Sequence, residues 1–257
     1  IQYVDRLLNC QLSMPGRLFD SRDYEFLLFE SMEDFVREVK ARDRESGLSR
    51  LVDGYAWEWV SRKDRTAFDI EIDKIKLKWN SANIDWVNSE NAVNEVGCIH
   101  TTQGYDLNYA GIIFGNEISY DRERNEILIK KENYHDKNGK NSISDPEELK
   151  NFILNIYKPI LLRGIKGTYV YVCDPDLREY FARHIPGFKK KKSVREVPID
   201  NLIPFENAIP LYDLTAAAGA FSENQVVTDF EWVAVPERIK PSEDLFACRV
   251  EGESMNK

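Results

Sequence analysis

One short polar segment separates two apolar runs in a pattern that could bind a ligand. The segment 100–106 reads His-Thr-Thr-Gln-Gly-Tyr-Asp. Gln103 and Asp106 offer hydrogen-bonding groups, and Gly104 lets a backbone approach a ligand closely. Ligands of open parallel sheets bind at the carboxyl ends of strands, and this segment follows such an end. The residues therefore predict either a ligand-binding connector or an ordinary strand-to-helix turn with a capping threonine.

A second candidate for chemistry is Arg163, which stands where a helix is expected to give way to a strand. It lies between Leu162 and two glycines, Gly164 and Gly167. A guanidinium at such a corner can reach a phosphate held by a neighbouring domain and stabilise charge on a transferring phosphoryl group. A solvated arginine at a helix end is the alternative that the residues leave open.

The elements expected around these residues alternate between helices and strands. Asp145, Pro146 and Glu148 combine a cap, a first-turn proline and a capping-box-like acid before an apolar stripe, which predicts a helix. A buried strand is expected over 167–174, followed by a helix with Pro175 near its start. This alternation predicts an α/β fold, a three-layer domain with a mainly parallel sheet.

Earlier parts of the chain fit the same scheme. The run 69–80 alternates apolar and polar residues, which predicts one half-exposed strand with Asp69, Glu71 and Asp73 on its solvent side. Other expected elements are strands within 24–31 and 49–59, a helix capped by Ser31 and a hairpin around 121–125.

Aromatic and histidine side chains offer weaker signals. Four tryptophans near the expected strands could stack on nucleobases, although burial in the core is the more common role. They are Trp57, Trp59, Trp79 and Trp86. His135 and His184 have no partners at ligand spacing, so no metal site is predicted.

The composition is that of an ordinary globular protein. The 257 residues are 42% hydrophobic and 31% charged, and no apolar run is long enough to span a membrane. The net charge of −9 argues against a general nucleic-acid coat, yet the first 204 residues carry only −3 of it. The four cysteines form no CxxC pair, so free thiols and a cytoplasmic location are expected.

Several motifs occur together in the order of a known class of ATPases. "IHTTQGYDLNYAGIIFG" resembles motif V of the superfamily-one helicases, and "IYKPILLRGIKGTYVYV" resembles their motif VI. Together with "SRLVDGYAWEWVSRKD" and "DWVN", these motifs resemble the domain-of-unknown-function family 2075. That family is a bacterial group of helicase-like P-loop ATPases related to the Schlafen helicase region. The resemblance covers roughly residues 1–185.

The resemblance implies that residues 1–188 form the second RecA-like domain of a helicase-like protein. Arg163 would then contact the γ-phosphate of ATP, and Gln103, Gly104 and Asp106 would couple nucleotide binding to strand binding. His100 and Thr101 would lie near single-stranded nucleic acid. Leu162 replaces the usual threonine of motif VI.

Part of an ATPase site is absent from the sequence. The chain has no GxxxxGK[ST] loop to hold phosphates and no evident acidic Walker B pair. Both would belong to a first RecA-like domain before Ile1, which would supply the binding site for ATP and Mg²⁺. The chain alone is therefore expected neither to bind ATP tightly nor to hydrolyse it.

The end of the chain differs in character from the rest. A lysine-rich stretch opens a predicted linker, 189–205, and short β-like runs follow over 206–257. The ending "CRVEGESMNK" resembles the nucleophile segment of LexA-like peptidases, with Ser254 in the nucleophile position. Ala218-Gly219 resembles their self-cleavage bond and precedes Ser254 by 35 residues. A turn serine and a small-residue loop are the alternatives.

Together these patterns predict the C-terminal half of a helicase-like ATPase joined to an incomplete LexA-like peptidase segment. The expected partners are an N-terminal RecA-like domain of the same protein and single-stranded nucleic acid, with no membrane. Two alternatives remain. One is a non-catalytic RecA-like scaffold or sensor, and the other is a self-cleaving stress-response regulator.

Overall fold

The computed structural model divides the chain into two compact units, Ile1–Phe188 and Lys189–Lys257. The residues described are 1–13, 18–82, 84–190, 203–212, 230–235 and 240–248.

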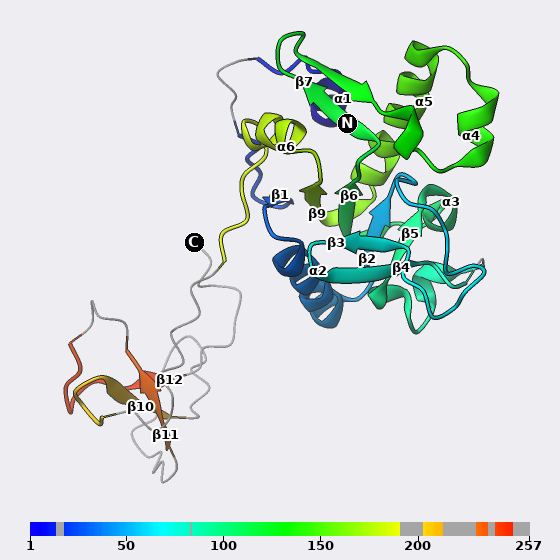
Figure 1. The fold of residues 1–257 in the computed structure, drawn as a ribbon. Coiled ribbons are helices and arrows are strands. Elements are labelled where there is room, and N and C mark those ends of the chain that lie inside the picture. The colour runs from blue at the N-terminus through cyan, green and yellow to red at the C-terminus, as the bar shows by residue number, and fades with distance from the viewer. Residues whose placement is uncertain (14–17, 83, 191–202, 213–229, 236–239, 249–257) are drawn as a thin grey trace. The chain divides into compact units, whose positions relative to one another are not determined.

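The first unit is built on a seven-stranded sheet with the order β1-β9-β6-β2-β5-β4-β3 (Figure 1). Neighbouring strands run parallel throughout, except for the antiparallel pair of β3 and β4. The strands are β1 (Glu25–Phe29), β2 (Ser49–Asp53), β3 (Ile70–Ile72), β4 (Ile75–Trp79), β5 (Glu95–Cys98), β6 (Leu107–Phe114) and β9 (Gly164–Val172). The predicted α/β fold with a mainly parallel sheet is therefore confirmed.

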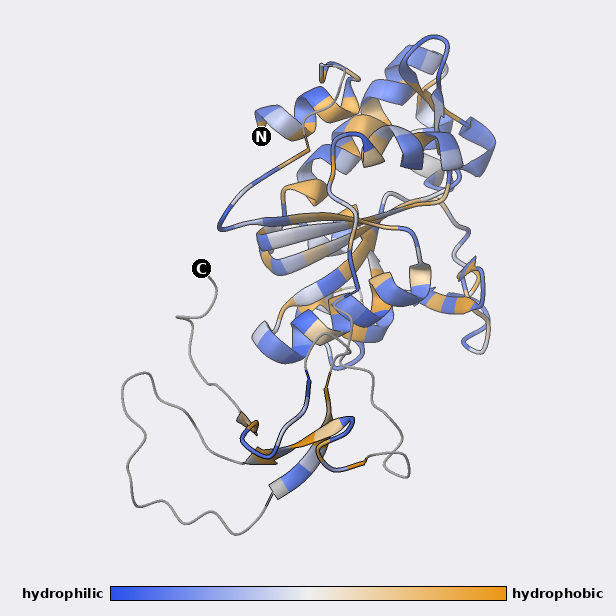
Figure 2. Cartoon of the chain, turned by 90° about the vertical axis from the view of Figure 1, so that its left-hand side faces the viewer, coloured by the Kyte–Doolittle hydropathy of each residue, from blue (hydrophilic) through white to orange (hydrophobic). Residues whose placement is uncertain are grey.

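Helices cover both faces of this sheet, which gives the unit three layers (Figure 2). One face packs against α2, and the other packs against α1, α5 and α6. The helices are α1 (Gln2–Leu8), α2 (Met32–Ser46), α3 (Ile99–Thr102), α4 (Lys137–Ser142), α5 (Pro146–Leu161) and α6 (Pro175–Ala182). Three short 3₁₀ turns are η1 (Trp86–Asn88), η2 (Ala92–Asn94) and η3 (Lys131–Asn133).

Side-chain caps begin the three longest helices where the sequence predicts a start. The hydroxyl of Ser31 accepts a hydrogen bond from the Asp34 amide at 3.2 Å. The carboxylate of Asp145 accepts one from the Glu148 amide at 2.9 Å. Asp174 caps α6 in the same way. Each cap satisfies an amide that lacks a partner in the first helical turn.

The interior strand β6 shows why both faces of the sheet need a covering layer. Ala110, Ile112 and Phe114 belong to the core shared with α1, α5 and α6, whereas Tyr109 and Ile113 belong to the core shared with α2. Successive residues of a strand point to opposite faces, so a strand with two apolar faces must lie inside a layered fold.

The run 69–80 differs from the single strand that its alternation predicts. It forms the hairpin of β3 and β4, which turns at Asp73 with a φ of +53°. Asp69 is also buried rather than on the solvent side, with 8% exposure. Its carboxylate accepts hydrogen bonds from the amide and hydroxyl of Ser61 and from the Trp79 amide, so it fixes the loop before β3.

A second hairpin, β7 (Ile118–Asp121) and β8 (Glu126–Ile129), closes around 122–125 as predicted. Tyr120 of this hairpin stacks on Tyr180 of α6 with a centroid separation of 4.7 Å. The hairpin therefore extends the layer that α5 and α6 form.

The second unit contains a small three-stranded sheet. It consists of β10 (Ala208–Tyr212), β11 (Phe230–Ala234) and β12 (Ala247–Cys248), with β10 in the centre. The predicted self-cleavage residues Ala218 and Gly219 and the predicted nucleophile Ser254 lie outside the described residues.

In the described part of the chain, no helix has the length and apolar character needed to cross a membrane.

Candidate functional site

The predicted segment 100–106 lies in the connector 99–106, which runs from the edge at the carboxyl ends of the parallel strands to the edge at their amino ends. Its start follows Cys98, which pairs in register with Asp53 at the carboxyl ends of β5 and β2. Its end leads into Leu107, which pairs with Gly164 at the amino ends of β6 and β9. One short segment of chain therefore links two opposite edges of the domain, and both edges carry predicted site residues.

At the carboxyl edge, the connector begins with the short helix α3. The hydroxyl of Thr101 accepts a hydrogen bond from the Cys98 amide at 3.0 Å and also lies 3.0 Å from the Cys98 carbonyl. Thr102 is buried and donates to the same carbonyl at 3.1 Å. Thr101 therefore has the capping role that the sequence left open. His100 is exposed, and its ring centroid lies 6.2 Å from that of Tyr55.

At the amino edge, the structure brings Arg163 and the turn before β6 together. Nη1 of Arg163 donates to the carbonyl of Tyr105 at 3.1 Å, and the carbonyl of Arg163 accepts from the Leu107 amide at 2.9 Å. Among the described residues, the buried Nε of Arg163 has no hydrogen-bond partner. One nitrogen of the guanidinium, Nη1, is therefore held by a hydrogen bond. The other N–H groups of the guanidinium can still donate to a ligand.

The turn itself is open to solvent. Gln103, Gly104 and Asp106 are exposed. Gly104 has a φ of +86°, and a Cβ built on it would meet no atom within 4 Å. A residue with a side chain is strained at this φ, although space is available, so the backbone geometry favours glycine here. Leu162, beside Arg163, is 37% exposed at the same edge.

Sequence reasoning missed a pair of buried acids at the carboxyl edge. Asp53 ends β2, Glu117 follows β6, and both side chains are completely buried. Oδ1 of Asp53 accepts from the amides of Tyr55 at 2.7 Å and Ala56 at 2.8 Å. One oxygen of Glu117 accepts a hydrogen bond from the hydroxyl of Tyr157. Oδ2 of Asp53 and Oε2 of Glu117 have no partner among the described residues.

Burial determines the protonation of this pair. Burial raises the pKa of Asp53 to about 7, against the opposing effect of the backbone amides. Burial, and then the negative charge of Asp53, raise the pKa of Glu117 well above its ordinary value. Two buried carboxyl groups that repel each other do not both ionise readily, so the pair retains a proton at neutral pH.

Close packing holds this acidic pair in place. A Cβ on Gly54 would lie 2.6 Å from Cζ of Tyr157, and one on Gly115 would lie 2.0 Å from Cβ of Ala56. Glycine is therefore required where β2 and β6 end. The sequence could have placed the two acids at one edge, because two apolar runs each lead into a glycine and an acid and the carboxyl ends of parallel strands meet there, but it gave no signal of their burial.

Aromatic side chains gather beside the same edge. Tyr55 stacks on Trp79 with centroids 5.4 Å apart, and Trp59 lies 6.2 Å from Trp79 at a tilt. Trp79 and Trp86 are core residues, with exposures of 1% and 0%. Trp57 and Trp59 are partly buried. Core burial was the more common role expected for these tryptophans, and it holds fully for Trp79 and Trp86.

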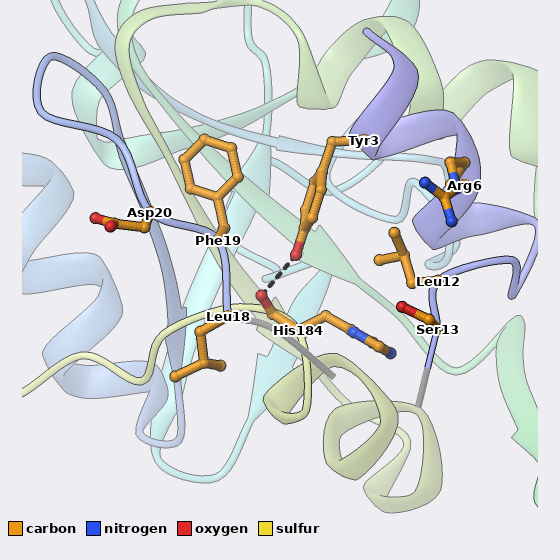
Figure 3. Close-up of a pocket in the computed structure, with 8 residues that line it drawn as sticks. All are labelled: Tyr3, Arg6, Leu12, Ser13, Leu18, Phe19, Asp20 and His184. Carbon is orange, nitrogen blue, oxygen red and sulfur yellow. Dashed lines mark hydrogen bonds between the residues drawn. The ribbon is translucent and has the colours of Figure 1, made fainter. Parts of the chain in front are cut away.

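A separate pocket contains none of the predicted site residues (Figure 3). It lies between α1 and the chain that follows α6, and its walls include Tyr3, Phe19 and His184. The hydroxyl of Tyr3 donates to the carbonyl of His184 at 2.6 Å, as the dashed line in Figure 3 shows. His184 is a buried residue with 1% exposure, although it forms part of the pocket wall.

The first unit is therefore an α/β domain with a mainly parallel sheet between helical layers, and the motif-like segments lie at both edges of that sheet. Residues 1–174 match the family described as Schlafen group 3, DNA/RNA helicase domain, and the chain belongs to this family. The chain is also 32% identical over 171 residues to the uncharacterized protein YPL245W of Saccharomyces cerevisiae. That similarity covers 63% of this chain and 37% of the yeast protein, so the chain spans well under half of its relative. No solved structure matches the chain.

Proposed function

We propose that this chain is the second RecA-like half of a helicase-like ATPase that couples ATP hydrolysis to nucleic-acid binding or translocation. One observation carries the proposal. The connector 99–106 links the carboxyl edge, where His100 lies, to the amino edge, where Arg163 contacts the Tyr105 carbonyl. Membership of the helicase family and the resemblance to the domain-of-unknown-function family 2075 support the same assignment.

In this proposal the amino edge faces ATP. Arg163 contacts the γ-phosphate and stabilises the charge that develops during phosphoryl transfer. The exposed turn of Gln103, Gly104 and Asp106 lies beside it and responds to the nucleotide. ATP and Mg²⁺ are held by a first RecA-like domain of the same protein, because this chain has no phosphate-binding GxxxxGK[ST] loop. The chain alone therefore does not turn over ATP.

The carboxyl edge faces a nucleic-acid strand in this proposal. His100 is exposed there, and Thr101 positions it by capping α3. The LexA-like peptidase role of Ser254, Ala218 and Gly219 stays a prediction from the sequence, because these residues lie outside the described ones.

The test is ATP turnover by the full-length protein that contains this chain, with and without single-stranded DNA. We expect DNA to stimulate turnover and Arg163→Ala to lower it by about 10³-fold or more, as losses of an arginine finger do. Arg163→Lys keeps the charge but loses the planar fork, so it should recover only a small part. Lys166→Ala is the matched control, because Lys166 is an exposed cation of β9 that lies three residues after Arg163.

Two outcomes would contradict the proposal. Robust turnover by the isolated 257 residues would show that a complete ATP site lies within them. Turnover that is indifferent to Arg163 would favour the alternative of a non-catalytic scaffold or sensor.

A further inference from the structure

Two hollows lie side by side where the chain leaves β2. The first has a volume of about 470 Å³ and the second about 650 Å³, within the range of small-molecule sites. Trp59 and Arg62 line both hollows, so this pair forms the wall between them. The wall belongs to the loop 54–69, whose start is fixed by the buried Asp53 through the Tyr55 and Ala56 amides.

Positive charge surrounds both hollows. Arg65 and Lys78 join Arg62 in lining the first, and Lys63 and Lys140 join it in lining the second. In the part of the chain that the structure describes, no carboxylate forms an ion pair with Arg62, Lys63 or Arg65, all of which are exposed.

Acidic side chains near the hollows offset only part of that charge. Glu95 lines the first hollow, but its carboxylate accepts hydrogen bonds from the Trp86 ring and the Ser81 amide. Glu58 and Asp136 line the second hollow. The first hollow therefore has three cationic side chains against one engaged carboxylate, which favours an anionic ligand.

The aromatic side chains beside these cations indicate which class of anionic ligand fits the hollows. Trp79 and Tyr55 support Trp59 at centroid distances of 6.2 and 6.4 Å, and the Arg62 guanidinium lies 5.6 Å from the Trp59 ring. A second pair, Lys78 and Phe68, lies 5.3 Å apart, with Phe68 50% exposed. Rings that are rigidly held beside cations suit a ligand with both flat bases and phosphates.

The second hollow lies beside the carboxyl edge of the sheet, which the proposed function assigns to a nucleic-acid strand. Tyr55 lines the second hollow, and its ring lies 6.2 Å from that of His100. A strand that passes His100 at the carboxyl edge can therefore continue over the loop 54–69.

We propose that the hollows on either side of Trp59 hold successive unpaired bases of a single-stranded nucleic acid. Trp59 is the stacking platform, and Arg62, Lys63 and Arg65 contact the phosphates. The proposal rests on the nucleic-acid part of the proposed function and adds a binding surface to it. Single strands fit better than duplexes, because only an unpaired base presents its face to a ring between two hollows.

The experiment is fluorescence anisotropy of labelled oligodeoxythymidine and oligouridine of 20 nucleotides, titrated with the 257-residue chain over a range of salt concentrations. We expect Trp59→Ala to weaken binding about tenfold or more, as loss of a stacked base does, and Trp59→Phe to restore most of it. Arg62→Ala and Arg65→Ala should each lower the salt slope by about 0.7. Arg44→Ala is the matched control, since Arg44 is exposed on α2 and lines neither hollow.

The outcomes of this experiment distinguish a failure of the inference from a failure of the proposed function. Binding that is unchanged in Trp59→Ala and in Arg62→Ala, but weakened by His100→Ala, overturns the inference and leaves the proposed function standing. Tighter binding of a duplex than of the single strand also overturns it, as does an absence of binding by the unchanged chain. The ATPase test on Arg163 decides the proposed function in each case. If Trp59→Ala fails to fold, the Arg62 and Arg65 variants and their salt slopes decide the inference.

Discussion

Replacing Asp53 with asparagine removes one of the two interacting acids buried at the carboxyl edge, and we expect it to stabilise the protein at pH 8. Asp53 and Glu117 are completely buried, and each has one oxygen without a partner among the described residues. The asparagine keeps an oxygen that can accept from the Tyr55 and Ala56 amides. Its amide group carries no charge, and it can donate where Asp53 cannot.

The magnitude follows from the pKa of Asp53, which is 3.8 in its ordinary state and about 7 in the fold. A raised pKa means that the folded protein binds more protons than the unfolded chain in this range. The free energy of unfolding therefore falls as the pH rises from about 4 to about 7, by about 4 kcal/mol for this difference. Burial of the asparagine amide retains some cost, so we expect a gain of about 2–4 kcal/mol at pH 8 and less than about 1 kcal/mol at pH 4.

The assay is urea unfolding followed by tryptophan fluorescence at pH 4, 6 and 8, for the unchanged protein, Asp53→Asn and Glu117→Gln. Glutamine at 117 can still accept from the Tyr157 hydroxyl, so this second variant should also gain stability at pH 8. Glu123→Gln is the control, because Glu123 is exposed in the β7–β8 turn and should change stability by less than about 0.5 kcal/mol.

The refuting result is equally specific. If the unchanged protein is as stable at pH 8 as at pH 6, the buried pair carries no excess proton. If Asp53→Asn is less stable than the unchanged protein at pH 8, the carboxylate is stabilised by its surroundings and burial does not dominate.

Two further changes test the packing and capping arguments. Gly54→Ala places a Cβ 2.6 Å from Cζ of Tyr157, so we expect a loss of about 1–3 kcal/mol of stability in urea unfolding, and an unchanged midpoint would show that the ring moves freely. Asp145→Ala removes the cap of α5, and we expect a loss of about 1 kcal/mol, or about 2–4 °C in thermal unfolding; the same loss in Asp145→Asn would contradict the capping role.

The sequence predicted the layered fold well, because its local signals are strong. Ser31 and Asp145 mark helix starts by hydrogen bonds that span three residues, and these need no tertiary information. The alternation of strands and helices was enough to predict a mainly parallel sheet. The sequence also singled out the segment 100–106 and Arg163, and the structure brings Arg163 against the carbonyl of Tyr105, while the roles of these residues stay predictions.

The features that were missed depend on contacts between distant residues. The solvent-side prediction for Asp69 was wrong because Ser61 and Trp79 provide donors that let a carboxylate lie in the core. Asp53 and Glu117 gave no signal of burial, because an acid after an apolar strand is usually solvated. Gly54 and Gly115 pack closely against Tyr157 and Ala56 at that edge, and such contacts between distant residues cannot be read from the sequence.

The course of the connector 99–106 has a thermodynamic consequence for the proposed function. Its two ends are fixed to opposite edges of one rigid sheet by β5 and β6. A nucleotide at the Arg163 edge that shifts the connector changes the free energy of binding a strand at the His100 edge. Linkage then requires the strand to change the nucleotide affinity by the same factor. In the proposed function, the eight residues of this connector therefore couple the binding of two ligands that do not touch each other.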